Sequence, residues 1–280
     1  MSKVCIITGA TDGIGKQTAL DLANIGYKLA LVGRNQDKGD AVINEIASAT
    51  GNNSLKYFNT DLSIIKNLYD LVQSIEKEYT SVDILINNAG AYFSKYYETS
   101  EHIELTFALN HLSYFQLTRL LMEILKKDKP GRVINVASSA HFSSSLNFND
   151  IQMKNNYRGW TAYCNSKLMN ILFTYEAHKR FKDTGVTFNS LHPGFVDTRF
   201  GDNNKGLGKN ILSIGKKLIA INVKKGAMTN FYLATSPEVV NVSGKYFDKS
   251  RSLSSSKVSY SDEKQDKLWV YSANIVESLV

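Results

Sequence analysis

Segments with the apolar composition of buried strands alternate with helix-like segments along almost the whole chain. Strands are expected at about residues 4–8, 28–33, 55–59, 82–86, 132–137, 186–191 and 244–247. Helices are expected at about residues 16–24, 37–49, 64–75 (capped by Ser63), 101–126 and 161–181. This alternation is typical of an α/β fold, in which a doubly wound parallel sheet of about seven strands carries helices on both faces. Ligands of such a sheet bind in the crevice at the carboxyl ends of the strands.

The pattern predicts a single domain over residues 1–280, because no internal repeat and no linker divides the chain. Within it, the Ser-rich segment 250–261 is expected to be a loop or a partly mobile segment of a C-terminal extension, 248–280. No apolar run approaches the roughly 20 residues of a membrane span, and Met1 lies too close to the first strand for an N-terminal anchor. The cysteines, Cys5 and Cys164, are not expected to form a disulfide, which favours a reducing, cytoplasmic location.

The net charge of +7 and the pI of about 9.1 describe a basic protein. A basic surface can bind nucleic acid, an anionic membrane or a polyanionic cofactor, or it can simply aid solubility. No RNA-binding or helix-turn-helix signature is visible, so nucleic acid is not expected as a partner.

Three glycines directly follow the first predicted strand and open the first helix. Gly9, Gly13 and Gly15 would let the backbone approach a pyrophosphate, with the helix N-terminus facing its negative charge. Their spacing is Gly-x-x-x-Gly-x-Gly rather than Gly-x-Gly-x-x-Gly, and a plain turn remains the alternative.

The second predicted strand ends in Gly33-Arg34-Asn35, where an NAD site usually places an acidic residue against the ribose. An arginine here suits the 2′-phosphate of NADP, which it can bind with paired donors, and Lys16 and Lys38 would add positive charge. The pattern favours NADP over NAD, although a solvated loop arginine is the simpler interpretation.

Tyr163 and Lys167 lie four residues apart on a predicted helix and therefore share one face. An ammonium beside a phenol favours the phenolate and would lower the tyrosine pKa from its usual value of about 10. Such a tyrosine could exchange a proton with a carbonyl oxygen near neutral pH. The same spacing also occurs by chance on solvated helices.

Taken in order, four motifs resemble those of the short-chain dehydrogenase/reductase family, in its form with a single Rossmann domain. They are Thr8 to Gly15, Asn87-Asn88-Ala89-Gly90, the pair Tyr163 and Lys167, and Pro193-Gly194. Segments 110–112, 135–141, 162–167, 192–194 and 236–247 are most similar to the branch of retinol dehydrogenases and WW-domain oxidoreductases.

This resemblance implies a catalytic set of Asn110, Ser138, Tyr163 and Lys167. Tyr163 would be the general acid in carbonyl reduction and the base in alcohol oxidation, with Lys167 lowering its pKa and binding the nicotinamide ribose. Ser138 would orient the substrate oxygen, with Ser139 as the alternative, and Asn110 would support a proton-relaying water.

The resemblance also implies a set of cofactor-binding residues. Asp61 and Leu62 would flank the adenine, although Asp61 could equally be a turn residue, and Thr198 would contact the nicotinamide amide or phosphate. The full set is Gly9, Thr11, Asp12, Gly13, Ile14, Gly15, Arg34, Asn35, Lys38, Asp61, Leu62, Asn88, Ala89, Gly90, Tyr163, Lys167, Pro193, Gly194, Val196 and Thr198.

Two other kinds of site have little support. The histidines, His102, His111, His141, His178 and His192, lack the spacing of metal ligands, so no metal is expected. The serines near Ser138 lack the Gly-x-Ser-x-Gly elbow of a hydrolase.

In the family the segment after Pro193-Gly194 forms a substrate lid, here 201–225. Apolar residues recur in it at helical spacing between lysines, which suits a lid over an apolar substrate or contact with an anionic membrane. Several aromatic residues could line the pocket or belong to the core: Phe93, Tyr96, Tyr97, Phe142, Phe148 and Trp160.

The expected function is that of an NADP-dependent carbonyl reductase or alcohol dehydrogenase acting on a small molecule. Its substrate would be an apolar aldehyde, ketone or alcohol, such as a retinoid, steroid or lipid-like carbonyl, although the lack of an expected anchor argues against retinoids. A non-catalytic NADP-binding redox sensor is the alternative. Pairing through the helices at 101–126 and 161–181 would give a homodimer.

Overall fold

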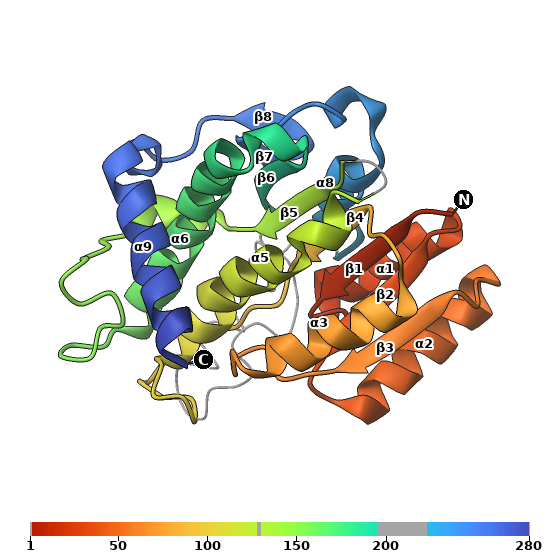
Figure 1. Cartoon of the computed structure of the whole chain (residues 1–280), viewed down its shortest axis with the longest axis horizontal. Coiled ribbons are helices and arrows are strands. Elements are labelled where there is room, and N and C mark those ends of the chain that lie inside the picture. The colour runs from red at the N-terminus through yellow and green to blue at the C-terminus, as the bar shows by residue number, and fades with distance from the viewer. Residues whose placement is uncertain (1, 128–129, 195–222, 280) are drawn as a thin grey trace.

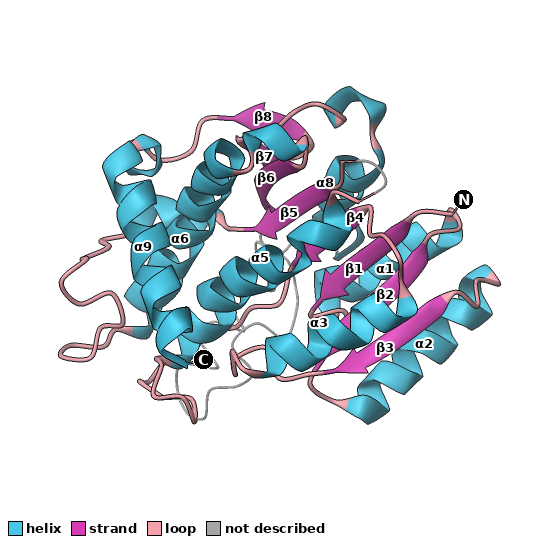
Figure 2. Ribbon diagram, viewed as in Figure 1, coloured by secondary structure: helices cyan, strands magenta, loops and turns pink. Residues whose placement is uncertain are grey.

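The computed structural model describes residues 2–127, 130–194 and 223–279. Its described part contains a sheet of eight strands in the order β3-β2-β1-β4-β5-β6-β7-β8, drawn as magenta arrows in Figure 2. The strands are β1 (Val4–Thr8), β2 (Lys28–Gly33), β3 (Leu55–Asn59), β4 (Ile84–Asn87), β5 (Arg132–Val136), β6 (Thr187–His192), β7 (Lys245–Asp248) and β8 (Arg251–Leu253). Strands β1 to β7 pair in parallel, which confirms the predicted doubly wound sheet.

The eighth strand was not expected. β8 pairs antiparallel with β7 at the edge of the sheet, within the segment that the sequence suggested was a loop. The chain reverses through Lys249 and Ser250, which adopt positive φ values of 49° and 60°. Neither is a residue type that favours this conformation strongly, so the turn carried no sequence signal.

The described helices are α1 (Gly13–Asn24), α2 (Gln36–Thr50), α3 (Asn67–Glu78), α4 (Leu105–Phe107), α5 (Ser113–Leu125), α6 (Gly159–Arg180), α8 (Val223–Thr235) and α9 (Asp262–Leu279). A π-helical turn, η1 (Ala108–Leu112), joins α4 to α5. The short 3₁₀ turns are η2 (Ser139–Ser143), η3 (Lys182–Thr184), η4 (Pro237–Val239) and η5 (Lys257–Tyr260).

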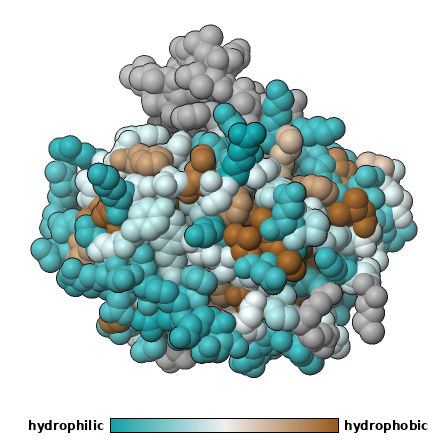
Figure 3. All heavy atoms as spheres, turned by 90° about the horizontal axis from the view of Figure 1, so that it is seen from above, coloured by the Kyte–Doolittle hydropathy of each residue, from teal (hydrophilic) through white to brown (hydrophobic). Residues whose placement is uncertain are grey.

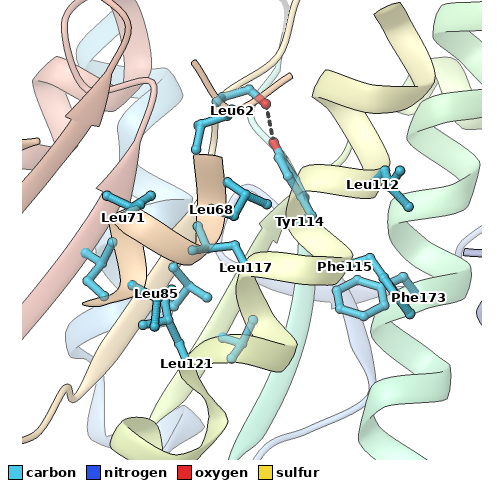
Figure 4. Packing of buried hydrophobic residues seen from close by; sticks show 14 of the residues in the cluster. Leu62, Leu68, Leu71, Leu85, Leu112, Tyr114, Phe115, Leu117, Leu121 and Phe173 are labelled. Carbon is cyan, nitrogen blue, oxygen red and sulfur yellow. Dashed lines mark hydrogen bonds between the residues drawn. The ribbon is translucent and has the colours of Figure 1, made fainter. Parts of the chain in front are cut away.

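Two apolar clusters hold these helices on opposite faces of the sheet. One joins the sheet to α1, α2 and α8, and the other joins it to α3, α5 and α6. In the second cluster the leucines of α3 and α5 meet near Leu85 of β4, and Phe115 lies beside Phe173 (Figure 4). Burial of apolar area on both faces therefore fixes the carboxyl ends of the strands relative to one another.

Helix α9 lies outside this second layer, alongside α6 (Figure 1). Trp269 meets Phe115 of α5 edge-on at 4.9 Å between ring centroids and stacks on Phe173 of α6 at 6.0 Å. The Arg180 guanidinium lies 4.8 Å from the centre of the Trp269 indole. Helix α9 of the same chain thus covers part of the α5 and α6 surface through which a homodimer was expected to pair.

Two helices begin later in the chain than predicted. The helix expected from residue 101 begins at Leu105, because the buried Glu104 carboxylate accepts the N–H groups of Thr106 and Phe107. The helix expected after Ser63 begins at Asn67 instead. The Glu101 carboxylate accepts the N–H groups of Ile65 and Lys66 just before it, a cap supplied from far along the chain.

Three further observations concern the cysteines, the helices and the surface. Cys5 and Cys164 are both buried and free, as expected. No helix in the described ranges combines the length and apolar character that crossing a bilayer requires. The face seen from above is largely hydrophilic, with a few hydrophobic groups (Figure 3).

Candidate active site

The glycine turn lies where the strand order reverses, between the carboxyl ends of β1 and β4. Gly9 and Gly13 have φ values of 66° and 53°, which non-glycine residues seldom adopt. A Cβ at Gly15 would lie 2.3 Å from the Gly9 carbonyl oxygen, and one at Gly9 would lie 2.8 Å from the Ala89 Cα. The turn is therefore closed to larger side chains, and it leads into the N-terminus of α1. Bare backbone followed by a helix N-terminus fits a diphosphate.

Polar side chains hold this turn rigidly against β4. The Asn88 amide donates to the carbonyl oxygens of Thr8 and Gly9, at 2.8 and 3.2 Å. The Thr8 hydroxyl accepts the N–H groups of Asn88 and Ala89. Asp12 caps α1 through the N–H of Gly13. The side chains of Asn88 and Asp12 thus shape the predicted cofactor site. Thr11, Ala89 and Gly90 lie in the same two loops, and Ile14 lies in the first turn of α1.

A second loop follows β2. The Tyr57 hydroxyl accepts the Asn35 N–H at 3.2 Å and donates to the Asn35 carbonyl at 2.9 Å. The Tyr57 ring occupies the space above Gly39, where a Cβ would come within 2.3 Å of it. Sequence reasoning missed Tyr57. Nothing in the sequence indicates that this aromatic residue of β3 packs on Gly33 and Gly39.

The residues expected at the adenine ribose lie on this loop and on the helices α1 and α2, and they have different partners. Arg34 and Lys38 are exposed, whereas Lys16 forms an ion pair with Glu45 at 2.6 Å. The Asn35 side chain caps α2 by accepting the Lys38 N–H. Arg34 and Lys38 therefore supply the exposed positive charge at the end of β2.

Asp61 and Leu62 follow the carboxyl end of β3. Asp61 accepts hydrogen bonds from the Ser63 N–H and hydroxyl at 2.9 and 2.7 Å, which is the turn role that the sequence left open. Ser63 is therefore part of this turn and not the cap of α3. Leu62 is buried in the core cluster. Contact of either residue with adenine stays a prediction.

The four predicted catalytic residues come from η1, from the segment after β5 and from α6, and they meet at the carboxyl ends of β4 and β5. Lys167 is buried on α6 with its ammonium 5.5 Å from the centre of the Tyr163 ring, and it donates to the Val136 carbonyl at 3.1 Å. Asn110 lies on the π-helical turn and donates to the Ala91 carbonyl at 2.9 Å. It also donates to the Ser166 hydroxyl at 3.1 Å, one residue before Lys167.

Gly90 lies between two members of this set. A Cβ there would be 3.3 Å from the Asn110 oxygen Oδ1 and 3.4 Å from Lys167 Nζ. The loop after β4 therefore approaches both groups closely, and the predicted cofactor-binding and catalytic residues form one continuous site.

Ser138 follows the last residue of β5 by two positions, and its hydroxyl is hydrogen-bonded to Tyr163. The same hydroxyl accepts the Ala140 N–H at 3.2 Å, which orients it at the start of η2. The residue that meets the tyrosine is therefore Ser138 and not its neighbour Ser139.

The expected electrostatics of the Tyr–Lys pair were wrong in one respect. Burial raises the pKa of Tyr163 above its usual value of 10, and the hydrogen bond from Ser138 opposes that rise. Burial also lowers the pKa of Lys167 to about 8. Burial opposes the charged form of each group, and the hydrogen bond with Ser138 is the contact that opposes the rise in the pKa of Tyr163.

Aromatic rings surround Tyr163. Trp160 stacks on its ring at 5.8 Å between centroids, and Tyr92, which sequence reasoning missed, meets it edge-on at 6.5 Å. Among the other aromatic candidates Phe93 is buried and Phe148 packs against the core, whereas Tyr96, Tyr97 and Phe142 are on the surface or partly so. Trp160 itself is 49% exposed and offers an apolar surface beside the Tyr163 ring.

Several predicted features fall at the edge of the described chain. Pro193 and Gly194 follow β6, with Gly194 at a φ of 84°. Val196, Thr198 and lid residues 201–222 lie outside the described residues. The last lid residues, 223–225, open α8 and expose Lys224 and Lys225. Within the ranges that the structure covers, no group of three or more potential metal ligands occurs.

Comparisons with known proteins show the family to which the chain belongs. Residues 3–206 match a family model described as short chain dehydrogenase. Retinol dehydrogenase 13 from Homo sapiens is 37% identical over 279 residues, which cover 98% of this chain and 84% of that protein.

Solved structures share the fold. A crystal structure of an uncharacterized protein from Mycobacterium paratuberculosis has a TM-score of 0.79 at 24% identity, covering 98% of this chain and 93% of that one. An alcohol dehydrogenase from the archaeon Thermococcus sibiricus, complexed with 5-hydroxy-NADP, has a TM-score of 0.69 at 22% identity. That comparison covers 88% of this chain and 95% of the other.

Proposed function

The chain is an oxidoreductase of the short chain dehydrogenase family, and we propose that it uses NADP(H) to interconvert an apolar aldehyde or ketone with its alcohol. The observation that carries this proposal is the convergence of Ser138, Tyr163 and Lys167 beside the glycine turn. A proton donor, a hydroxyl that can orient an oxygen, and a cation lie there together.

Bound NADPH would supply the hydride, and the chain's own residues would supply the proton and the geometry. The Tyr163 hydroxyl donates its proton to the carbonyl oxygen, which the Ser138 hydroxyl holds in place. The phenolate left on Tyr163 would be stabilised by the Lys167 ammonium, whose nitrogen lies 5.5 Å from the ring centre. Alcohol oxidation runs through the same groups in reverse.

The preference for NADP(H) rests on the loop after β2. The exposed Arg34 of this loop and the exposed Lys38 in the first turn of α2 would bind the 2′-phosphate. The archaeal alcohol dehydrogenase, which was solved with an NADP analogue, accords with such a site in this fold.

The preference for an apolar substrate rests on Trp160 and Tyr92, whose rings contact the ring of Tyr163. The name of the human relative, a retinol dehydrogenase, agrees with this substrate class. A retinoid, steroid or lipid-like carbonyl would fit this class.

The two free cysteines agree with a cytoplasmic location.

The test is a panel of carbonyl compounds, from short aldehydes to all-trans-retinal and a keto-steroid, offered with NADPH and with NADH. Loss of the nicotinamide absorbance should be fastest with NADPH and apolar carbonyls. NADPH that binds tightly and is never oxidised would instead identify a redox sensor.

A further inference from the structure

His141 connects the predicted substrate serine to the C-terminal extension. It lies on η2, three residues after Ser138, and is only 1% exposed. Its Nδ1 atom is 2.6 Å from the Ser138 carbonyl oxygen, and its Nε2 atom is 3.0 Å from the backbone nitrogen of Ser256. One imidazole thus bridges two segments that are 115 residues apart in sequence.

The chemistry of the two partners determines where the proton lies. A backbone N–H can only donate, so Nε2 must accept from Ser256 and carry no hydrogen. Nδ1 then carries the hydrogen and donates it to the Ser138 carbonyl, which can only accept. The ring is therefore a neutral imidazole in a single tautomer. Burial lowers the pKa of His141, which agrees with this state.

The surroundings hold the ring in place. Tyr246 of β7 meets it edge-on at 5.0 Å between ring centroids, and Phe142 packs on it at 4.1 Å. On the far side, the Ser255 hydroxyl is 2.7 Å from the Tyr175 hydroxyl, so the extension is anchored to α6, the helix that carries Tyr163. His141 therefore joins the end of β5 to the helix of the catalytic tyrosine.

The imidazole of His141 binds the backbone of Ser138 itself, through the Ser138 carbonyl. The Ser138 carbonyl accepts both the His141 ring N–H and the His141 backbone N–H, the latter at 3.2 Å. Two donors on this carbonyl fix the backbone that aims the Ser138 hydroxyl at Tyr163. Catalysis tolerates little displacement at such a place, because a shift of about 1 Å can cost about 100-fold in rate.

We propose that His141 is a positioning residue, which uses the C-terminal extension to hold Ser138 in register with Tyr163. The proposal rests on the function proposed above for Ser138. The C-terminal extension would then contribute to the reaction through Ser256, in addition to covering α5 and α6.

Two substitutions separate the two bonds of the imidazole. His141→Asn places an amide N–H near the position of Nδ1 and keeps the bond to Ser138, but it cannot reach Ser256. His141→Gln places an amide oxygen near the position of Nε2 and keeps the bond to Ser256, but it loses the donor to Ser138. Both remove the ring and its packing, so each is the matched control of the other.

With NADPH and the best carbonyl of the panel, kcat of His141→Gln should fall about 10- to 100-fold. His141→Asn should stay within about threefold of the wild type. The dissociation constant for NADPH, measured by fluorescence, should be nearly the same in both variants. Equal kcat values in two variants that both fold, as judged by circular dichroism and thermal unfolding, would overturn the proposal.

A second measurement keeps the proposal testable if neither variant folds or if no substrate turns over. In the wild-type protein, ¹⁵N chemical shifts of His141 should show a neutral ring protonated at Nδ1. A charged ring or the Nε2–H tautomer would refute the bridge. Absence of turnover in the wild type with this tautomer present would instead count against the proposed function alone.

Discussion

Replacing Lys167 with methionine should stabilise the fold while it removes activity. The lysine is buried, and burial lowers its pKa from the ordinary value of 10.5 to about 8. Each factor of ten in an acid dissociation constant corresponds to about 1.4 kcal/mol, so the charged side chain costs the folded state about 3 kcal/mol. Methionine fills a similar volume without charge, and the Val136 carbonyl keeps a hydrogen bond from Asn170.

The pH dependence of this effect has a definite sign. Below pH 8 both the folded and the unfolded chain carry the Lys167 proton, and the folded chain bears the full penalty. Between pH 8 and 10.5 the folded chain loses that proton while the unfolded chain keeps it, so the stability of the wild type rises with pH. The advantage of Lys167→Met should therefore be about 3 kcal/mol at pH 7 and should shrink toward zero near pH 10.5.

Urea unfolding without cofactor, at a series of pH values, measures this difference directly. Lys77→Met, at an exposed site on α3, is the control, and its difference from the wild type should not change with pH. A constant difference between Lys167→Met and the wild type over the same range would refute the assigned burial of the charge.

Three further predictions concern the cofactor site and the C-terminal helix. Arg34→Asp should shift the ratio of kcat/KM toward NADH by about 10-fold or more, because a carboxylate repels the 2′-phosphate; an unchanged ratio would remove the reason for choosing NADP. Gly15→Ala should weaken NADPH binding and destabilise the fold by about 1–3 kcal/mol, since its Cβ would meet the Gly9 carbonyl at 2.3 Å; calorimetry showing wild-type affinity would contradict the close approach. Trp269→Ala should cost about 2 kcal/mol in urea unfolding by removing the half-buried contact with Phe115 and Phe173, and an unchanged midpoint would mean that α9 adds little to the core.

The sheet could be predicted because each parallel strand is a short apolar run followed by a helical pattern. Those local signals do not depend on distant residues, so they located β1 to β7 within a few positions. β8 was not predicted because it is exposed and because the turn before it uses Lys249 and Ser250 instead of glycine. The start of α3 was missed because the Glu101 carboxylate sets it from far along the chain, and the start of α4 was missed because its cap, Glu104, is not among the residue types that favour this position.

The site residues were predictable as a set, whereas their electrostatics were not. Spacing put Tyr163 and Lys167 on one helical face, but desolvation depends on what surrounds that face. Tyr57, Tyr92 and His141 act through partners from other elements, and no local pattern distinguishes them from ordinary core residues.

The central claim is that the Tyr163 hydroxyl supplies the proton for carbonyl reduction. Tyr163→Phe removes that hydroxyl and keeps the ring between Trp160 and Tyr92. With NADPH and the best carbonyl substrate, kcat should fall by about 10²- to 10⁴-fold, while the NADPH dissociation constant stays within about twofold of the wild type. A variant that retains wild-type kcat would contradict the claim.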